Sequence, residues 1–131
     1  MTAVAALATY ARSSATTAGP AEVVRMAYER IITACNRAEH AEDEDNDVAN
    51  WLQVFHDEVV RAQAILVELA AGLALEHPDP GVVDLAVHLA DLYRYCIDQL
   101  IAANLSKNPE PLDDVRVVIA GLLDAWMRRA S

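Results

Sequence analysis

The sequence predicts an all-α protein, an antiparallel up-down-up-down four-helix bundle with a mobile N-terminal arm. Apolar residues make up 54% of the 131 residues and aromatic residues only 5%, a balance that suits packed helices better than a β-sandwich. The five prolines, at positions 20, 78, 80, 109 and 111, lie between periodic segments and never inside one. Between them, apolar residues recur at intervals of three and four, the spacing of a helix with one buried face.

The first part of the chain divides into an arm and a helix. Residues 1–18 are rich in Ala, Thr and Ser and are predicted to form the mobile arm, while 19–131 form the bundle. Pro20 is expected to open a helix over 20–40. The acidic run Glu39–Asp47 holds six acids and no base, and we interpret it as a solvated loop that ends this helix. The apolar stripe of the helix is Val24, Ala27, Tyr28, Ile31, Cys35 and Ala38.

Three further helices are predicted over 47–76, 80–105 and 110–129, separated by EHPDPG and SKNPEP. Asp79 is expected to cap the third helix and Pro80 to open it. The second helix has a regular 4-3 seam, Val48, Leu52, Phe55, Val59, Ala62, Leu66, Leu69 and Leu73. The core stripe of the third is Leu85, Leu89, Leu92, Tyr93, Cys96, Leu100 and Ala103. That of the fourth is Leu112, Val115, Ile119, Leu122 and Trp126.

The second and third helices carry more apolar surface than one core requires. Opposite its seam, the second helix presents Val60, Ala64, Val67, Ala71 and Ala74. The third helix has a second stripe of Val83, Val87, Ala90, Ile97 and Ile101. Such faces favour a groove for an amphipathic helix of a partner. Coverage by the N-terminal arm, self-association and imperfect bundle geometry are the alternatives.

Tyr93 and Tyr95 are two residues apart on the third helix, so they point about 200° apart. Tyr93 belongs to the core stripe, as Tyr28 does on the first helix. Tyr95 falls beside the polar side of its helix. We therefore expect Tyr93 to pack inside the bundle and Tyr95 to face outward as a surface contact.

Composition excludes several classes of partner and compartment. A net charge of −10 argues against nucleic acid and anionic membranes, which need a basic face. Cys35 and Cys96 each lie in an apolar stripe without a CxxC motif, so buried thiols are expected rather than a disulfide. No run of about 18 apolar residues indicates a membrane span, and the N-terminus is a poor signal peptide. The expected location is the cytoplasm.

No pattern of catalytic or metal-binding residues is present. None of the four histidines follows a glutamate by three residues, so the Glu-x-x-His motif of di-iron bundles is absent. Asp84, His88 and Asp91 share one helix face at a spacing that could hold a metal, but we interpret them as a solvated polar face. No phosphate-binding loop and no nucleophile with a partnered base are visible. The chain is not expected to be an enzyme or to need a cofactor.

Several short segments stand in a specific order and spacing between about Leu7 and Trp126. They are Leu7 and Tyr10, Pro20, the Met26–Tyr28 pair, RAQAILVEL (Arg61–Leu69), LADLYRY (Leu89–Tyr95), LIAANL (Leu100–Leu105) and DAWMRR (Asp124–Arg129). Together they resemble the FliS family of flagellin-specific export chaperones of the flagellar type III secretion system. The family's Met-Leu-Tyr-Asp-Gly run stands here as MAYER (Met26–Arg30).

This resemblance implies a chaperone that binds the disordered C-terminal region of flagellin, which folds into helices along apolar grooves. It implies that binding prevents premature polymerisation and that the flagellar export gate is a further partner. Leu7 and Tyr10 match the family's arm residues, and Asn104 matches its Ala-Asn pair, although a C-terminal helix cap explains Asn104 equally well. The expected partner-binding residues are Leu7, Tyr10, Val60, Val67, Tyr95, Ile97, Ile101 and Asn104. A homodimeric structural or regulatory protein is the alternative.

Overall fold

The computed structural model describes residues 19–44 and 46–130, which contain four long helices and, within these ranges, no strand. The helices are α2 (Pro20–Glu44), α3 (Val48–Ala71), α4 (Pro80–Ser106) and α5 (Glu110–Ala130). The predicted all-α four-helix bundle is therefore confirmed. The predicted arm, with Leu7 and Tyr10, lies outside the described residues.

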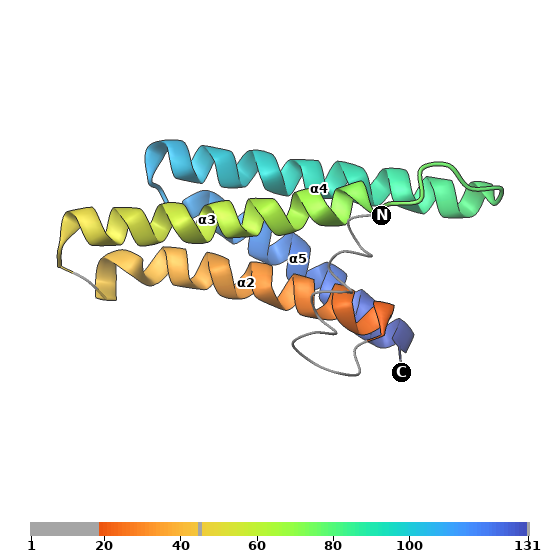
Figure 1. The fold of residues 1–131 in the computed structure, drawn as a ribbon, viewed down its shortest axis with the longest axis horizontal. Helices are drawn as coiled ribbons and strands as arrows, with labels where there is room; N and C mark the ends of the chain where they lie inside the picture. The colour runs from red at the N-terminus through yellow and green to blue at the C-terminus, as the bar shows by residue number, and fades with distance from the viewer. Residues whose placement is uncertain (1–18, 45, 131) are drawn as a thin grey trace.

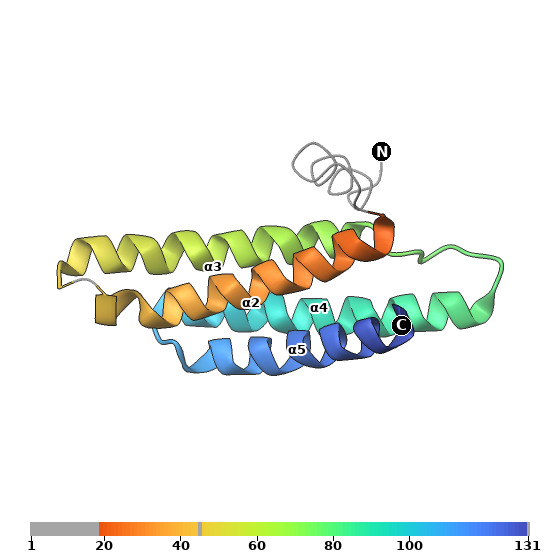
Figure 2. The same cartoon turned by 90° about the horizontal axis from the view of Figure 1, so that it is seen from below.

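The four helices form a square in cross-section. Helix α2 packs against α3 and α5, and α4 packs against the same two helices, while the diagonal pairs make no close backbone contact. Successive helices run toward opposite ends of the bundle (Figures 1 and 2). A short connection requires the next helix to run in the opposite direction. The three residues between α4 and α5 span about 10 Å, whereas each helix is more than about 30 Å long, so the chain cannot return to the far end of α4 before α5 begins.

Side-chain caps fix the helix starts. Asp47 precedes α3 and its carboxylate accepts hydrogen bonds from the amides of Ala49 at 3.0 Å and Asn50 at 3.4 Å. Asp79 precedes α4 and accepts from the amide of Gly81 at 2.9 Å, with Pro80 at the first helical position. The predicted cap and opening proline of the third helix are thus confirmed.

Tyr28 of α2 and Tyr93 of α4 meet across the diagonal of the core. Both are only 2% exposed, their hydroxyl oxygens are 2.7 Å apart, and their ring centroids are 6.5 Å apart. Each hydroxyl supplies the hydrogen-bond partner that the other needs in an apolar surrounding. Tyr95 is 43% exposed, so the predicted division between the two tyrosines of α4 is confirmed.

Around this pair the core is filled by small and medium-sized side chains. Phe55, Ile31, Leu66, Leu100, Leu112 and Ile119 are the largest fully buried ones. Cys35 and Cys96 are buried free thiols, as expected. Burial raises the pKa of the Cys35 thiol to about 12 and that of Cys96 to about 11.

Polar contacts attach α5 to α2. The Arg116 guanidinium donates to the Glu39 carboxylate at 2.7 Å and to the Asn36 side chain at 3.3 Å. At the other end of α5, the Trp126 indole donates to the Ala21 carbonyl at 2.9 Å. These contacts close the side of the bundle where the first and last helices meet.

Two predicted helix boundaries were wrong. The first helix does not stop at residue 40 but continues to Glu44, into the acidic run that we expected to be a loop. Ala38 and Ala41 stay buried there and Glu39 is held by Arg116, so packing overrides the unfavourable acids at the helix end. The second helix ends at Ala71 rather than at residue 76, and Gly72 is its C-cap residue.

Two residues of the predicted core stripes are exposed. Val48 is 59% exposed because it begins α3 at the end of the bundle. Leu85 is 49% exposed, while the neighbouring Ala86 is buried. The first turns of α4 extend beyond the ends of α2 and α5 (Figures 1 and 2), so an apolar stripe there has no helix to cover it. Similarly, Val23 rather than Val24 is buried near the start of α2.

Replacing both members of the tyrosine pair should destabilise the bundle by less than the sum of the two single replacements. We expect Tyr28→Phe or Tyr93→Phe alone to lower the free energy of unfolding by about 1–3 kcal/mol, because the remaining buried hydroxyl loses its partner. The double variant should lose clearly less than the sum of the two. Urea denaturation of the four proteins measures this cycle, and strictly additive losses would contradict the pairing.

The buried thiols should be unreactive in the folded protein. Because their pKa values are raised, we expect iodoacetamide to alkylate Cys35 and Cys96 at least about a hundredfold more slowly than in urea-unfolded protein at mildly alkaline pH. Mass spectrometry follows the reaction. Equal rates in both states would show that the thiols are accessible.

Candidate functional site: an open groove between α3 and α4

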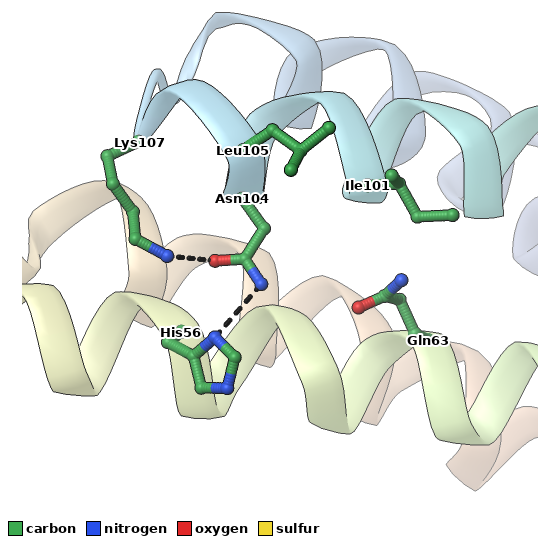
Figure 3. Close-up of a pocket in the computed structure, with 6 residues that line it drawn as sticks. All are labelled: His56, Gln63, Ile101, Asn104, Leu105 and Lys107. Atoms are coloured by element: carbon green, nitrogen blue, oxygen red, sulfur yellow. Dashed lines mark hydrogen bonds between the residues drawn. The ribbon is translucent and has the colours of Figure 1, made fainter.

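A cavity of about 500 Å³ opens between α3 and α4 on the bundle surface. It is lined by His56 and Gln63 of α3, by Ile101, Asn104 and Leu105 of α4, and by Lys107 just after α4 (Figure 3). Apolar and polar side chains are separated within it. Ile101 lies opposite Gln63, while His56, Asn104 and Lys107 gather at the end of α4. We call this cavity and its apolar continuation along α3 and α4 the α3–α4 groove.

The polar end of the groove depends on how α4 terminates. Lys107 adopts a left-handed backbone conformation, with φ of 52°, and its amide donates to the Ala103 carbonyl. The Asn108 amide donates to the same carbonyl at 3.1 Å, so α4 ends by a left-handed cap. The Lys107 side chain lies over the Phe55 ring of α3, with Nζ 5.7 Å from the ring centroid.

A chain of hydrogen bonds crosses this end of the groove. The Lys107 ammonium donates to Oδ1 of Asn104. Because an ammonium can only donate, the Asn104 oxygen faces Lys107 and the Asn104 Nδ2 group faces His56. Nδ2 lies 3.0 Å from Nδ1 of His56 and donates to it (Figure 3). When the imidazole is neutral, this arrangement places its proton on Nε2.

Apolar side chains continue the groove along both helices. Val60 and Val67 lie three residues before and four after Gln63, so they share its helix face, and they are 42% and 53% exposed. On α4, Ile101 is 41% exposed, and Ile97 lies one turn away, half-buried against the core. Leu105, at 84% exposed, forms the outer edge. Parts of the two predicted surplus apolar faces, Val60 and Val67 on α3 and Ile97 and Ile101 on α4, therefore lie toward this cavity by helical spacing.

The residues predicted to bind a partner separate into three groups. Ile101 and Asn104 line the cavity between α3 and α4, and helical spacing places Val60, Val67 and Ile97 on the same faces of these two helices. Tyr95 is not among them, because it lies about 200° from Ile97 around α4 and faces α5. Partial desolvation there, together with the Asp114 carboxylate of α5, raises the pKa of the Tyr95 phenol. Leu7 and Tyr10 lie outside the described residues.

Of the two explanations given for Asn104, the helix cap is excluded. Lys107 caps α4 instead, and the Asn104 side chain turns into the groove. Sequence analysis missed His56, Gln63, Leu105 and Lys107 as groove residues. A signal for two of them was available, since His56 and Gln63 are seven residues apart and flank Val60 on one helix face. Because His56 and Gln63 are polar, they were not assigned to the apolar face that contains Val60.

Other kinds of site find little support in the described part of the chain. No group of three or more His, Cys, Asp or Glu side chains is placed there to hold a metal ion. None of the described helices combines the length and apolar content that crossing a bilayer requires. What remains is an open, largely apolar groove with a hydrogen-bonding end. Fold and groove together place the protein among helical bundles with an open surface groove.

Comparison with known proteins identifies the family. The family model described as "Flagellar protein FliS" matches residues 3–131. A flagellar secretion chaperone FliS of Campylobacter jejuni serotype O:6 is 33% identical over 118 residues, which cover 89% of this chain and 84% of that protein. One of Vibrio cholerae serotype O1 is 28% identical over 114 residues, covering 87% and 77%. The chain belongs to the FliS family, and the resemblance noted in the sequence is confirmed.

The hydrogen-bond chain at the polar end predicts the tautomer of one histidine. We expect long-range ¹H–¹⁵N spectra recorded above neutral pH to show the Nε2–H form of His56 in the wild-type protein. In an Asn104→Asp variant the carboxylate can only accept, so the Nδ1–H form should prevail. An Nδ1–H form in the wild-type protein would contradict the arrangement of Lys107, Asn104 and His56.

Proposed function

We propose that this protein is a cytoplasmic export chaperone that binds the disordered C-terminal region of flagellin. The flagellin segment folds into helices as it binds, with one helix lying in the α3–α4 groove. Binding keeps flagellin from polymerising too early and delivers it to the flagellar export gate. The observation that supports this most strongly is the continuous exposed apolar groove in a chain of the FliS family.

The groove has the chemistry that an amphipathic helix needs. Val60, Val67 and Ile101 each leave two-fifths or more of their surface exposed in the free protein. Burying such side chains contributes about 25 cal/mol per Å² of apolar area. Ordering a disordered client costs several kcal/mol, so contacts along the length of the groove are needed to offset it. A continuous groove supplies them better than scattered apolar residues would.

The polar end suggests the direction in which a bound helix lies. Lys107 brings a positive charge and uses one of its three donors on Asn104. The C-terminal end of a helix carries partial negative charge and unpaired carbonyl groups. A client helix whose C-terminal end lies at Lys107 satisfies both sides, whereas the reverse direction would place a positive helix end against an ammonium group.

The same apolar residues also suit a homodimer, which is the second candidate. A symmetric dimer would bury Val60, Val67 and Ile101 of both copies. The two candidates differ in how they respond to flagellin. Self-association that disappears when client is added supports the chaperone, and a tight dimer indifferent to flagellin supports the structural alternative.

Substitutions in the groove should weaken client binding without unfolding the bundle. We expect Val67→Asp to raise the dissociation constant for the C-terminal flagellin segment by about tenfold or more, because it places a charge in the apolar interface. Tyr10→Ala should also weaken binding if the arm contributes a contact. Isothermal titration calorimetry measures the affinity, and circular dichroism follows the helix gained by the client.

Val117→Asp is the matched control. Val117 is 72% exposed on α5, away from the groove, and the substitution introduces the same charge. Its affinity for the flagellin segment should equal that of the wild-type protein. Equal weakening by Val67→Asp and Val117→Asp would show that net charge, not the groove, governs binding.

A further inference from the structure

A second cleft, on the opposite side of α3, combines three arginines with one buried carboxylate. It lies between α2 and α3, has a volume of about 230 Å³, and is lined by Arg30, Thr33, Ala34, Arg37, Glu58 and Arg61. Glu58 and Val60 are two residues apart on α3, so this cleft and the α3–α4 groove occupy different faces of that helix. The α2–α3 cleft and the α3–α4 groove can therefore each hold a ligand at the same time.

The arginines of this cleft are available to a ligand. Arg30 and Arg37 are exposed, lie two turns apart on the same face of α2, and form no ion pair with any described residue. Arg61 approaches the Glu58 carboxylate only to 3.9 Å. Three guanidinium groups against one carboxylate give the cleft a formal charge of +2 in a protein whose net charge is −10.

Glu58 contributes a buried carboxylate to the wall of this cleft. The residue is only 9% exposed, and its Oε2 atom is buried without a hydrogen-bond donor among the described residues. Because that oxygen is out of reach, a ligand of this cleft meets the exposed Arg30 and Arg37 and needs acidic groups for them.

We propose that the α2–α3 cleft binds an acidic segment of a partner polypeptide. Aspartate or glutamate side chains meet Arg30 and Arg37 in charge-assisted hydrogen bonds. A nucleic-acid backbone fits poorly, since its phosphates continue beyond this small cleft along a protein of strong net negative charge.

The chain itself does not supply this segment within one molecule. Residues 1–18 contain no Asp or Glu, so they lack the charge that the cleft requires. The acids that follow Arg37 in α2 belong to the same rigid helix and cannot fold back onto it, and Glu39 is already paired with Arg116. The acidic segment therefore comes from another molecule.

An acetylated and amidated hexaglutamate peptide, fluorescently labelled, is the probe for this cleft. We expect saturable binding in fluorescence anisotropy that weakens as salt is added, and no binding of the matching hexaglutamine peptide. The test variant is Arg30→Gln/Arg37→Gln, which should weaken binding by about tenfold or more. The control variant is Arg94→Gln/Arg128→Gln, which removes the same charge elsewhere and should bind like the wild-type protein. Circular dichroism verifies the fold of both.

Three results would overturn the proposal. Equal loss in both double variants would show diffuse electrostatic attraction without a site. Displacement of the peptide by an equal concentration of inorganic phosphate would indicate an unspecific anion site. Light scattering that showed a wild-type dimer, dissociated by Arg30→Gln/Arg37→Gln, would assign the cleft to a second copy of this chain. Flagellin binding is measured separately, so its outcome does not decide this one.

Discussion

The buried hydrogen bond between Tyr28 and Tyr93 is the contact on which the geometry of the bundle depends most. It joins α2 and α4 across the diagonal, where the backbones make no close contact. Both hydroxyls need a partner in an otherwise apolar core, and within the described residues they bond to each other. The pair therefore restricts the rotation of α4 about its axis. Any rotation that removed Tyr93 from the core would leave the buried Tyr28 hydroxyl without its hydrogen-bond partner.

The rotation of α4 in turn decides what the surface can bind. With Tyr93 inward, Tyr95 is directed toward α5, whereas Ile97, Ile101 and Asn104 are directed toward α3. There Ile101 and Asn104 lie across the cavity from His56 and Gln63, on the face of α3 that also carries Val60 and Val67. The α3–α4 groove is thus a consequence of core packing, and the left-handed end of α4 completes it by placing Lys107 beside Asn104.

The two surfaces of α3 differ in chemistry in a way that suits two different partners. The groove toward α4 is apolar with a hydrogen-bonding end, while the cleft toward α2 is lined by guanidinium groups around a buried carboxylate. A chaperone must hold its client and also be recognised with the client bound. Because the groove and the cleft lie on separate faces of α3, a client in the groove does not block a partner in the cleft.

Much of the fold could be predicted from the sequence, since apolar periodicity, capping aspartates and prolines are local signals. Tyr93, Tyr95 and the surplus apolar faces followed from helical spacing alone. Tertiary features could not be predicted in this way. The Arg116–Glu39 pair that accompanies the longer α2 joins residues 77 positions apart, and the exposure of Leu85 depends on where neighbouring helices stop. The hydrogen bond of His56 to Asn104 depends on the left-handed backbone at Lys107. Glycine is the usual residue in that conformation, and a lysine there does not predict it.

The central claim is that flagellin binds in the α3–α4 groove. The most direct test is a methyl NMR spectrum of protein labelled at Val, Leu and Ile, recorded with and without the C-terminal flagellin segment. Binding in the groove should shift the methyl signals of Val60, Val67 and Ile101 and leave those of Val117 in place. A saturable complex in which the three groove residues keep their free-state shifts would contradict this account.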